Sequence, residues 1–280
     1  DGSEKNVKDE PLLWLTSYFG YTGNTFEVDD IVGSVQFAGL AADYAAVTAI
    51  DLNSQSLTTD FNFLDKFVNL LDFRCFSNLI TVLDLSQSTN LIQLHCFINQ
   101  ISILDVANLV NLEQVYCFDN QISILDVTSL VKLNRLHCYN NQISILDVTN
   151  LVDLTELYCQ NNQISVLDLS LLINLIDLKC HINPLFSIDL TALINLQFLR
   201  CFSNNLTSLS LSNNAKLTLV RTDDNQLDAD VNSQLLIDLD THGLSNGYFR
   251  SQIFGGGTLT TAGLAAKAAL LLKGWTIVGL

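Results

Sequence analysis

Seven cysteines are the residues whose chemistry has to be settled first. They lie 21 residues apart, at positions 75, 96, 117, 138, 159, 180 and 201. A zinc site needs cysteines in close pairs such as C-x-x-C, and the sequence has none. The odd count also leaves at least one thiol without a disulfide partner. We therefore expect free, buried thiols that act as small hydrophobic groups, with no metal and no cofactor.

Two sets of carboxylates are further candidates for chemistry. One is a ladder of aspartates at the same 21-residue interval: Asp84, Asp105, Asp126, Asp147, Asp168 and Asp189. A metal array is conceivable, but in a turn after a strand such side chains are expected to hydrogen-bond the loop backbone. The other set, Asp228, Asp230 and Asn232, has the D-x-D-x-N spacing of a calcium loop. Ser233 and Leu239 occupy the positions of the required glycine and glutamate, which favours a solvated acidic edge and leaves calcium open.

The residues beside the cysteines point to binding rather than catalysis. Most residues directly before a cysteine position are basic or aromatic, and most residues directly after it are aromatic. The expected ligand-binding residues are Arg74, Phe76, His95, Phe97, Tyr116, Phe118, Arg135, His137, Tyr139, Tyr158, Lys179, His181, Arg200 and Phe202. Aromatic rings beside Arg and His are enriched on binding surfaces. Phe97 and Phe118 could also stack as a stabilising ladder, and both interpretations can hold.

The elements that position these residues are the copies of one repeat. Aligned on the cysteines, it reads L-x-x-L-x-C-x-x-N-x-[IL]-x-x-L, with full copies beginning at Leu70, Leu91, Leu112, Leu133, Leu154, Leu175 and Leu196. A period of this length predicts a solenoid, in which each turn buries its apolar face on its neighbours. The L-x-x-L-x-C segment predicts a short parallel strand with alternate side chains inward. The asparagine of each copy can satisfy loop backbone groups of successive turns.

This pattern is the leucine-rich-repeat signature over about residues 47–230, from a longer first turn near Val47 to a decaying copy at Leu217. More narrowly, the chain resembles the 21-residue, cysteine-bearing repeats of internalin-like bacterial surface proteins, with I-L-D-V-T-S-L-V-K-L (124–133) as the turn after the strand. The resemblance implies an α/β solenoid with a parallel sheet on its concave face. It also implies an extracellular module, on a cell surface or a virion, that binds a protein or a glycan.

The flanks lack the repeat and are expected to cover the open ends of the core. We predict an N-terminal cap over 1–46, a solenoid over 47–230 and a small α/β cap over 231–280. The N-terminal cap carries aromatic residues such as Trp14 and Tyr18. The C-terminal cap predicts helices near 232–240 and 261–273 and strands near 248–254 and 275–278. Its last segment, A-G-L-A-A-K-A-A-L-L-L-K-G-W-T-I-V, weakly resembles a terminal module of bacterial and phage surface proteins.

The composition of the chain argues against several classes of binding partner. The net charge of −16 makes nucleic acid and anionic membranes poor partners. No run of 18 apolar residues is present, so membrane insertion is not expected. The absence of methionine and the start at Asp1 suggest a processed form or a fragment. No nucleophile, base and acid come together as a set, which predicts a protein that is not an enzyme.

Two apolar columns fall where the repeat should face outward. They are Val82, Ile103, Ile124, Ile145 and Val166, and Val110, Val131, Val152, Ile173 and Ile194. Either they pack under neighbouring coils or they contact another subunit. The sequence thus predicts a surface adhesin or receptor-binding module that recognises its ligand through the concave face. Histidine protonation there should change binding between about pH 5.5 and 7. The alternative is a self-associating structural subunit, or an appended domain, of a fibre, surface layer or virion.

Overall fold

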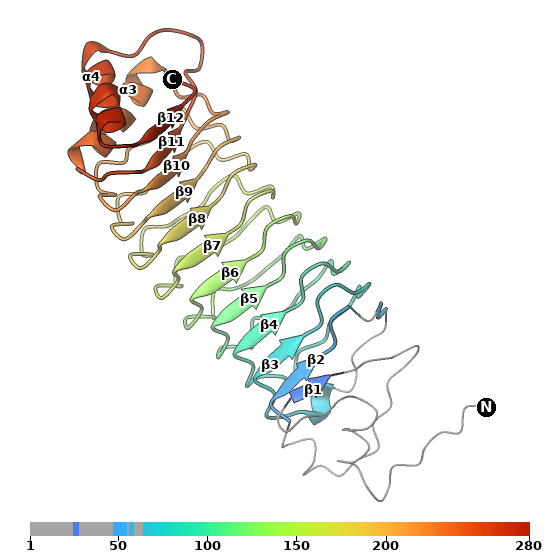
Figure 1. The fold of residues 1–280 in the computed structure, drawn as a ribbon. Coiled ribbons are helices and arrows are strands. Elements are labelled where there is room, and N and C mark those ends of the chain that lie inside the picture. The colour runs from blue at the N-terminus through green and yellow to red at the C-terminus, as the bar shows by residue number, and fades with distance from the viewer. Residues whose placement is uncertain (1–24, 28–46, 55, 59–63) are drawn as a thin grey trace, which may run out of the picture. The chain divides into compact units, whose positions relative to one another are not determined.

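The computed structural model describes residues 25–27, 47–54, 56–58 and 64–280. By its internal contacts the chain divides into two compact units, Asp1–Lys132 and Leu133–Leu280. Each unit is a solenoid of the 21-residue repeat, and in each the strands form a parallel ladder (Figure 1). The predicted solenoid with a parallel sheet is confirmed, whereas the predicted domain boundaries at 46/47 and 230/231 stay predictions.

The described part of the first unit contains five paired strands of three residues each. In order across the ladder they are β1 (Thr25–Glu27), β2 (Ala49–Asp51), β3 (Asp72–Arg74), β4 (Gln93–His95) and β5 (Gln114–Tyr116). A short 3-10 helix, η1 (Leu64–Lys66), precedes β3. The register places Phe73 beside Leu94 and Arg74 beside His95, so equivalent repeat positions are direct neighbours.

The second unit continues the same arrangement and adds two helices. Its strands, in ladder order, are β6 (Arg135–His137), β7 (Glu156–Tyr158), β8 (Asp177–Lys179), β9 (Phe198–Arg200), β10 (Leu219–Arg221), β11 (Tyr248–Arg250) and β12 (Thr276–Val278). The helices are α3 (Ala229–Thr241) and α4 (Thr261–Leu272), which follow β10 and β11 and pack on each other. They match the predicted C-terminal helices closely.

The interior of both units is built from alternating strand residues. In each repeat strand from β3 to β10 the central residue is buried and its two neighbours are half-buried. All seven cysteines are free and buried, as predicted. Burial disfavours the charged thiolate and raises the pKa of the Cys159 and Cys201 thiols to about 12. The cysteines therefore belong to the apolar core and are poor nucleophiles.

The predicted asparagine ladder is present in both units. The Asn183 amide donates to the carbonyl oxygens of Cys159 and Cys180, both at 3.1 Å, and its oxygen accepts from the Ile164 N–H at 3.0 Å. In the first unit, Asn99 makes the equivalent bonds at 3.0–3.1 Å. One side chain thus satisfies backbone groups of two successive turns. This ties neighbouring repeats together where the chain leaves the strand.

Two backbone features fix the turns on either side of this asparagine. The residue before it has a positive φ in every repeat, between 52° and 56° at Ser77, Ile98, Asp119, Asn140, Asn161, Ile182, Ser203 and Asp224. Further along, each ladder aspartate accepts a hydrogen bond from the backbone N–H two residues later, as in Asp84 with Ser86 at 2.9 Å. The pKa of Asp84 is lowered chiefly by that bond. The predicted backbone role of the aspartate ladder is confirmed.

The structure corrects the first interpretation of the two apolar columns. Val82, Ile103, Ile124, Ile145 and Val166 are 57–80% exposed, and the second column is 43–54% exposed. Packing under neighbouring coils is therefore wrong. The adjacent leucine of each turn, such as Leu104 beside Ile103, is the residue that enters the core. In the first unit Val82, Ile103 and Ile124 form isolated parallel bridges, so their side chains project from one edge of the turns.

The two caps differ in what can be described. Apart from β1, the predicted N-terminal cap with its aromatic residues, Trp14 and Tyr18 among them, lies outside the described residues. At the other end, Asp228 caps α3 by accepting from the Val231 N–H at 2.9 Å, and Thr260 caps α4 by accepting from the Gly263 N–H at 3.0 Å. Gly243, with φ of +75°, follows α3 as expected. No helix in the described part of the chain is long and apolar enough to span a bilayer.

Candidate functional site

The outward face of the strands carries three columns of side chains. We name them by their place relative to the cysteine position: the first column lies three residues before it, the second one residue before and the third one residue after. In a strand these alternate positions share one face. All predicted binding residues lie in these columns, with Arg135 in the first. The structure places them on the strand face of each unit and leaves their role in binding untested.

In the first unit the third column is a stack of phenylalanine rings. Phe76 and Phe97 are parallel with ring centroids 4.4 Å apart, and Phe97 and Phe118 are parallel at 4.3 Å. In the second column, His95 stacks on Tyr116 at 4.7 Å. The stabilising ladder considered from the sequence is therefore real. Phe97 is covered on both faces, so only its edge can contact a ligand.

Two pairs of polar side chains on the first unit's strand face bind each other. Two guanidinium nitrogens of Arg74 donate hydrogen bonds to the Asp72 carboxylate, at 2.6 Å and 3.2 Å. These bonds raise the pKa of Arg74. The Tyr116 hydroxyl donates to Gln114 at 3.0 Å. Both bonds join the first and second columns within one strand. This surface is thus mainly aromatic, with its single arginine already neutralised.

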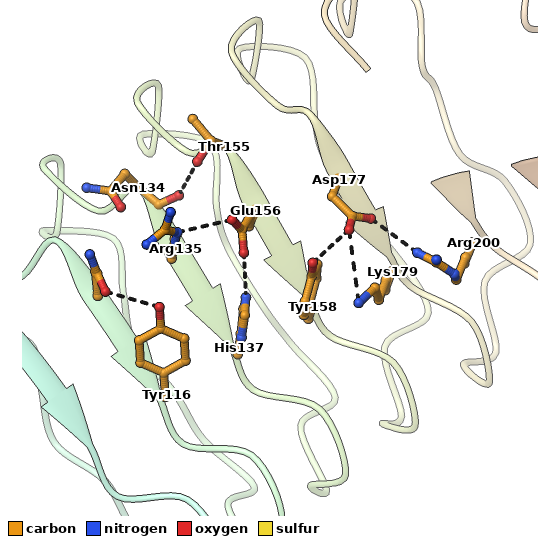
Figure 2. A network of polar contacts seen from close by, with 11 residues as sticks. Tyr116, Asn134, Arg135, His137, Thr155, Glu156, Tyr158, Asp177, Lys179 and Arg200 are labelled. Carbon is orange, nitrogen blue, oxygen red and sulfur yellow. Dashed lines mark hydrogen bonds and ion pairs between the residues drawn. The ribbon is translucent and has the colours of Figure 1, made fainter. Parts of the chain in front are cut away.

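In the second unit several polar contacts run from one strand to the next (Figure 2). Arg135 donates to Glu156 at 3.1 Å, and His137 Nε2 lies 3.1 Å from the other oxygen of that carboxylate. His137 also stacks on Tyr158 at 4.0 Å, and the Tyr158 hydroxyl donates to Asp177 at 2.7 Å. Each contact links one repeat to the next. These contacts hold the outward side chains of β6, β7 and β8 in fixed rotamers.

Cations occupy the second column on four consecutive strands, β8 to β11: Lys179, Arg200, Arg221 and Arg250. The ammonium of Lys179 lies 3.4 Å from the Tyr158 ring centroid, and the Arg221 guanidinium lies 3.9 Å from that of Phe202. Arg221 and Arg250 both contact Asp223, at 3.0 Å and 3.2 Å. The aromatic and basic residues that the sequence places beside the cysteines thus form a charged surface on this unit.

The histidines of the strand face are neutral at physiological pH. Burial lowers the pKa of His95, and it also lowers that of His137 despite the neighbouring Glu156. For His181, burial and the nearby Arg200 and Arg221 lower the pKa to about 4. The expected change in binding between pH 5.5 and 7 stays a prediction, and a pKa of about 4 means that His181 does not contribute to it. Its titration lies well below that window.

The acidic edge near 223–232 is occupied by structural contacts. Asp223 is 5% exposed and binds Arg221 and Arg250. Asn225 belongs to the asparagine ladder, Asp228 caps α3, and Asn232 donates to the carbonyl oxygens of Leu227 and Asp228. Within the described residues, no group of His, Cys, Asp or Glu side chains is arranged to hold a metal ion. These side chains fit the fold of the cap better than a calcium site.

Sequence reasoning missed the carboxylates of the first column, which supply the counterions of this face. Asp72, Glu156 and Asp177 each bind a cation of the second column or Arg135. Their signal was present in the sequence, because strand alternation that turns Lys179 outward must also turn Asp177 outward. Arg250 was missed because β11 follows a helix and lies outside the 21-residue period.

Comparison with solved structures places this architecture among known proteins. The functional domain of InlJ from Listeria monocytogenes, whose structure includes a cysteine ladder, is 32% identical over 81% of the chain with a TM-score of 0.72. The chain is a leucine-rich-repeat protein with a cysteine ladder and resembles the internalins. It spans about half of that InlJ domain, 48%. No family model matches the chain, and no curated protein matches it by sequence.

More distant leucine-rich-repeat structures share the fold. The internalin InlF from Listeria monocytogenes is 20% identical, with a TM-score of 0.66 over 94% of this chain and 87% of that one. The ectodomain of the plant receptor kinase GASSHO1/SCHENGEN3 from Arabidopsis thaliana, solved in complex with CASPARIAN STRIP INTEGRITY FACTOR 2, is 19% identical. Its TM-score is 0.67 over 84% of this chain and 32% of that one. The internalin-like leucine-rich-repeat fold is typical of protein-interaction and adhesion modules.

Proposed function

We propose that this chain is a non-enzymatic recognition module that binds a protein partner through the outward strand face. The observation that carries the proposal is the dense set of ordered, partly exposed aromatic and charged side chains on the sheet. Rings and arginines held by neighbours lose little conformational freedom on binding, and such anchors commonly dominate interface energies. A bacterial or phage adhesin acting outside the cell, at a cell or virion surface, is the setting that the resemblance to internalins favours.

A protein partner is preferred over a glycan because of how the rings stack. Carbohydrate recognition through aromatic side chains needs open ring faces, and both faces of Phe97 are covered by Phe76 and Phe118. In the second unit, Lys179 lies over Tyr158 and Arg221 lies over Phe202. What this surface offers is ring edges and hydrogen-bond donors, which suit the carbonyl and carboxylate oxygens of a polypeptide.

The second candidate function is a structural subunit of a larger assembly, and the exposed apolar columns favour it. Ile103, Ile124 and Ile145 are 75–80% exposed and repeat at one position of the turns. Solvent-facing stripes of this kind can mark a contact surface. In that case the stripe would bury itself against another copy, and the strand face would be dispensable.

One experiment separates the two candidates. The parent chain is screened against an array of extracellular proteins, and each captured protein is titrated against two variants. Phe97→Ala/Phe118→Ala removes anchors from the strand face, whereas Ile103→Ser/Ile124→Ser removes apolar area from the turns. Recognition through the strand face predicts loss of at least tenfold in affinity for the first variant only. Loss with the second variant only, together with loss of an oligomer on size-exclusion chromatography, would overturn the proposal in favour of the structural one.

A further inference from the structure

The cations of the second unit form a continuous row. The strand register places Lys179 beside Arg200, Arg200 beside Arg221, and Arg221 beside Arg250. These four residues are among only 13 Lys and Arg in a chain of net charge −16. Like charges directly opposite on neighbouring strands repel each other and destabilise a sheet. Such a row in so acidic a chain therefore calls for a compensating interaction.

The carboxylates of the face compensate the row only in part. Two of them lie within reach, Asp177 and Asp223. Asp177 accepts its shortest bond from the Tyr158 hydroxyl at 2.7 Å, whereas Arg200 and Lys179 approach it at 3.5 Å and 4.0 Å. Those two distances are at or beyond the limit of a hydrogen bond. Lys179 and Arg200 thus retain donors that a bound anion can use.

The donors of this row are open to solvent and held in place. The side chains of Lys179, Arg200, Arg221 and Arg250 are 23%, 27%, 27% and 44% exposed. Ring contacts orient two of them, Lys179 on Tyr158 and Arg221 on Phe202. Burial, together with the nearby Arg200 and Arg221, lowers the pKa of the neighbouring His181 to about 4. An anion arriving here would meet preorganised donors and need little rearrangement.

We propose that the row Lys179–Arg200–Arg221–Arg250 is a binding site for an acidic segment of a protein partner. This inference rests on the proposed function and names the chemistry of the partner. Nucleic acid is disfavoured because the chain as a whole repels polyanions of that charge density. A sulfated glycan is disfavoured because the adjoining rings of Tyr158 and Phe202 already carry cations on their faces.

The spacing of the row indicates how such a segment would bind. Neighbouring strands are about 4.8 Å apart, so the four cations span about 14 Å. In an extended chain, alternate residues lie about 6.7 Å apart, so three alternate acidic residues span about 13 Å. An extended segment that crosses the strands with Asp or Glu at every second position would therefore place its carboxylates along the row. Arginine can bind each carboxylate with two parallel hydrogen bonds.

The probe for this site is a short fluorescein-labelled peptide of alternating glutamate and threonine, with a glutamine–threonine peptide as the neutral counterpart. Fluorescence anisotropy with the full chain should show binding of the acidic peptide alone, weakening as salt rises. Lys179→Gln/Arg200→Gln should reduce the affinity by about tenfold or more. Lys132→Gln/Lys216→Gln makes the same change in net charge outside the strands and should leave binding unchanged.

The melting temperature distinguishes a binding row from a purely structural one. Because removing two of four adjacent cations relieves repulsion, Lys179→Gln/Arg200→Gln should melt no lower than the parent. A lower melting temperature combined with unchanged peptide affinity would overturn the inference in favour of structural ion pairs. Absence of binding by the parent, or binding of dextran sulfate in place of the acidic peptide, would also overturn it.

Different results would contradict the proposed function and this inference. If Lys179→Gln/Arg200→Gln keeps a protein captured from the array while Phe97→Ala/Phe118→Ala loses it, strand-face recognition stands and the acidic chemistry is wrong. If both variants keep that protein with parental affinity, the strand face is not the site, and both proposals fall.

Discussion

The two units have interiors of the same construction and differ in the side chains that they show to solvent. Asn99 in the first unit and Asn183 in the second make the same hydrogen bonds to successive turns. Outside, the first unit presents stacked Phe76, Phe97 and Phe118, whereas the second presents a row of cations with its counterions. The inward positions are set by the need to stack repeats. The outward positions do not contribute to that stacking, so their side chains can vary and determine which ligand binds.

The largest expected effect tests the shared interior. Asn99→Ala and Asn183→Ala each leave one backbone N–H without its acceptor and remove one of the two asparagine donors from each of two cysteine carbonyl oxygens. An unsatisfied buried N–H costs about 1–3 kcal/mol and each lost hydrogen bond about 0.5–1.5 kcal/mol, so each variant should lose roughly 2–5 kcal/mol of unfolding free energy. Urea denaturation measures this. Losses of unfolding free energy that differ greatly between the two variants would contradict the view that both units have the same kind of interior.

A smaller effect is expected from the cysteines. Cys96→Ser and Cys180→Ser place a hydroxyl in an apolar position of each unit and should each cost about 1–3 kcal/mol. Because burial raises the pKa of these thiols, Ellman's reagent should label almost none in the native protein and all seven in denaturant. Rapid labelling of several native thiols would show that the core is not closed.

Substitution of two isoleucines is expected to stabilise the protein. Ile98 and Ile182 have φ of 54°, a conformation that β-branched residues adopt at a cost of about 1–2 kcal/mol. Asn140 and Asn161 hold the same position in other repeats. Ile98→Asn or Ile182→Asn should therefore stabilise its unit by about 1 kcal/mol. Ser77→Ile is the reverse control and should destabilise; thermal melts that show no difference would contradict this account of the turn.

The smallest expected effect is the pH dependence of stability that His181 gives to the outward face of the second unit. The pKa of His181 falls from 6.5 in the unfolded chain to about 4 in the folded one. Between these values the unfolded state binds more protons, so the free energy of unfolding decreases as pH falls from 6.5 toward 4. Partial exposure screens the effect. His181→Phe should weaken this pH dependence relative to the parent in urea titrations, and identical slopes would count against the assignment.

The interior was predictable from the sequence because its signals are local and repeated. Leucine and cysteine positions predict the strands, Asn183 and its equivalents predict the turn ladder, and the apolar spacing around 261–273 predicts α4. Each follows from strand or helix periodicity, with no knowledge of long-range contacts.

The outward face was predictable only in outline. That Lys179 and Arg200 face outward follows from alternation, but their shared contact with Asp177 depends on strand register and rotamers. The exposure of Ile103 depends on the turn conformation, which sends Leu104 inward instead. The low pKa of His181 arises from burial and from cations on the next two strands, and no local pattern contains those cations.

Hydroxyl-radical footprinting of the chain bound to a protein captured from the array tests the central claim most directly. It reports which side chains a partner covers, on both faces of the repeat at once. Recognition through the strand face predicts protection of Phe97, Phe118, Tyr158 and Phe202, with no change at Ile103 and Ile124. Protection of Ile103 and Ile124 with unchanged strand-face rings would contradict it.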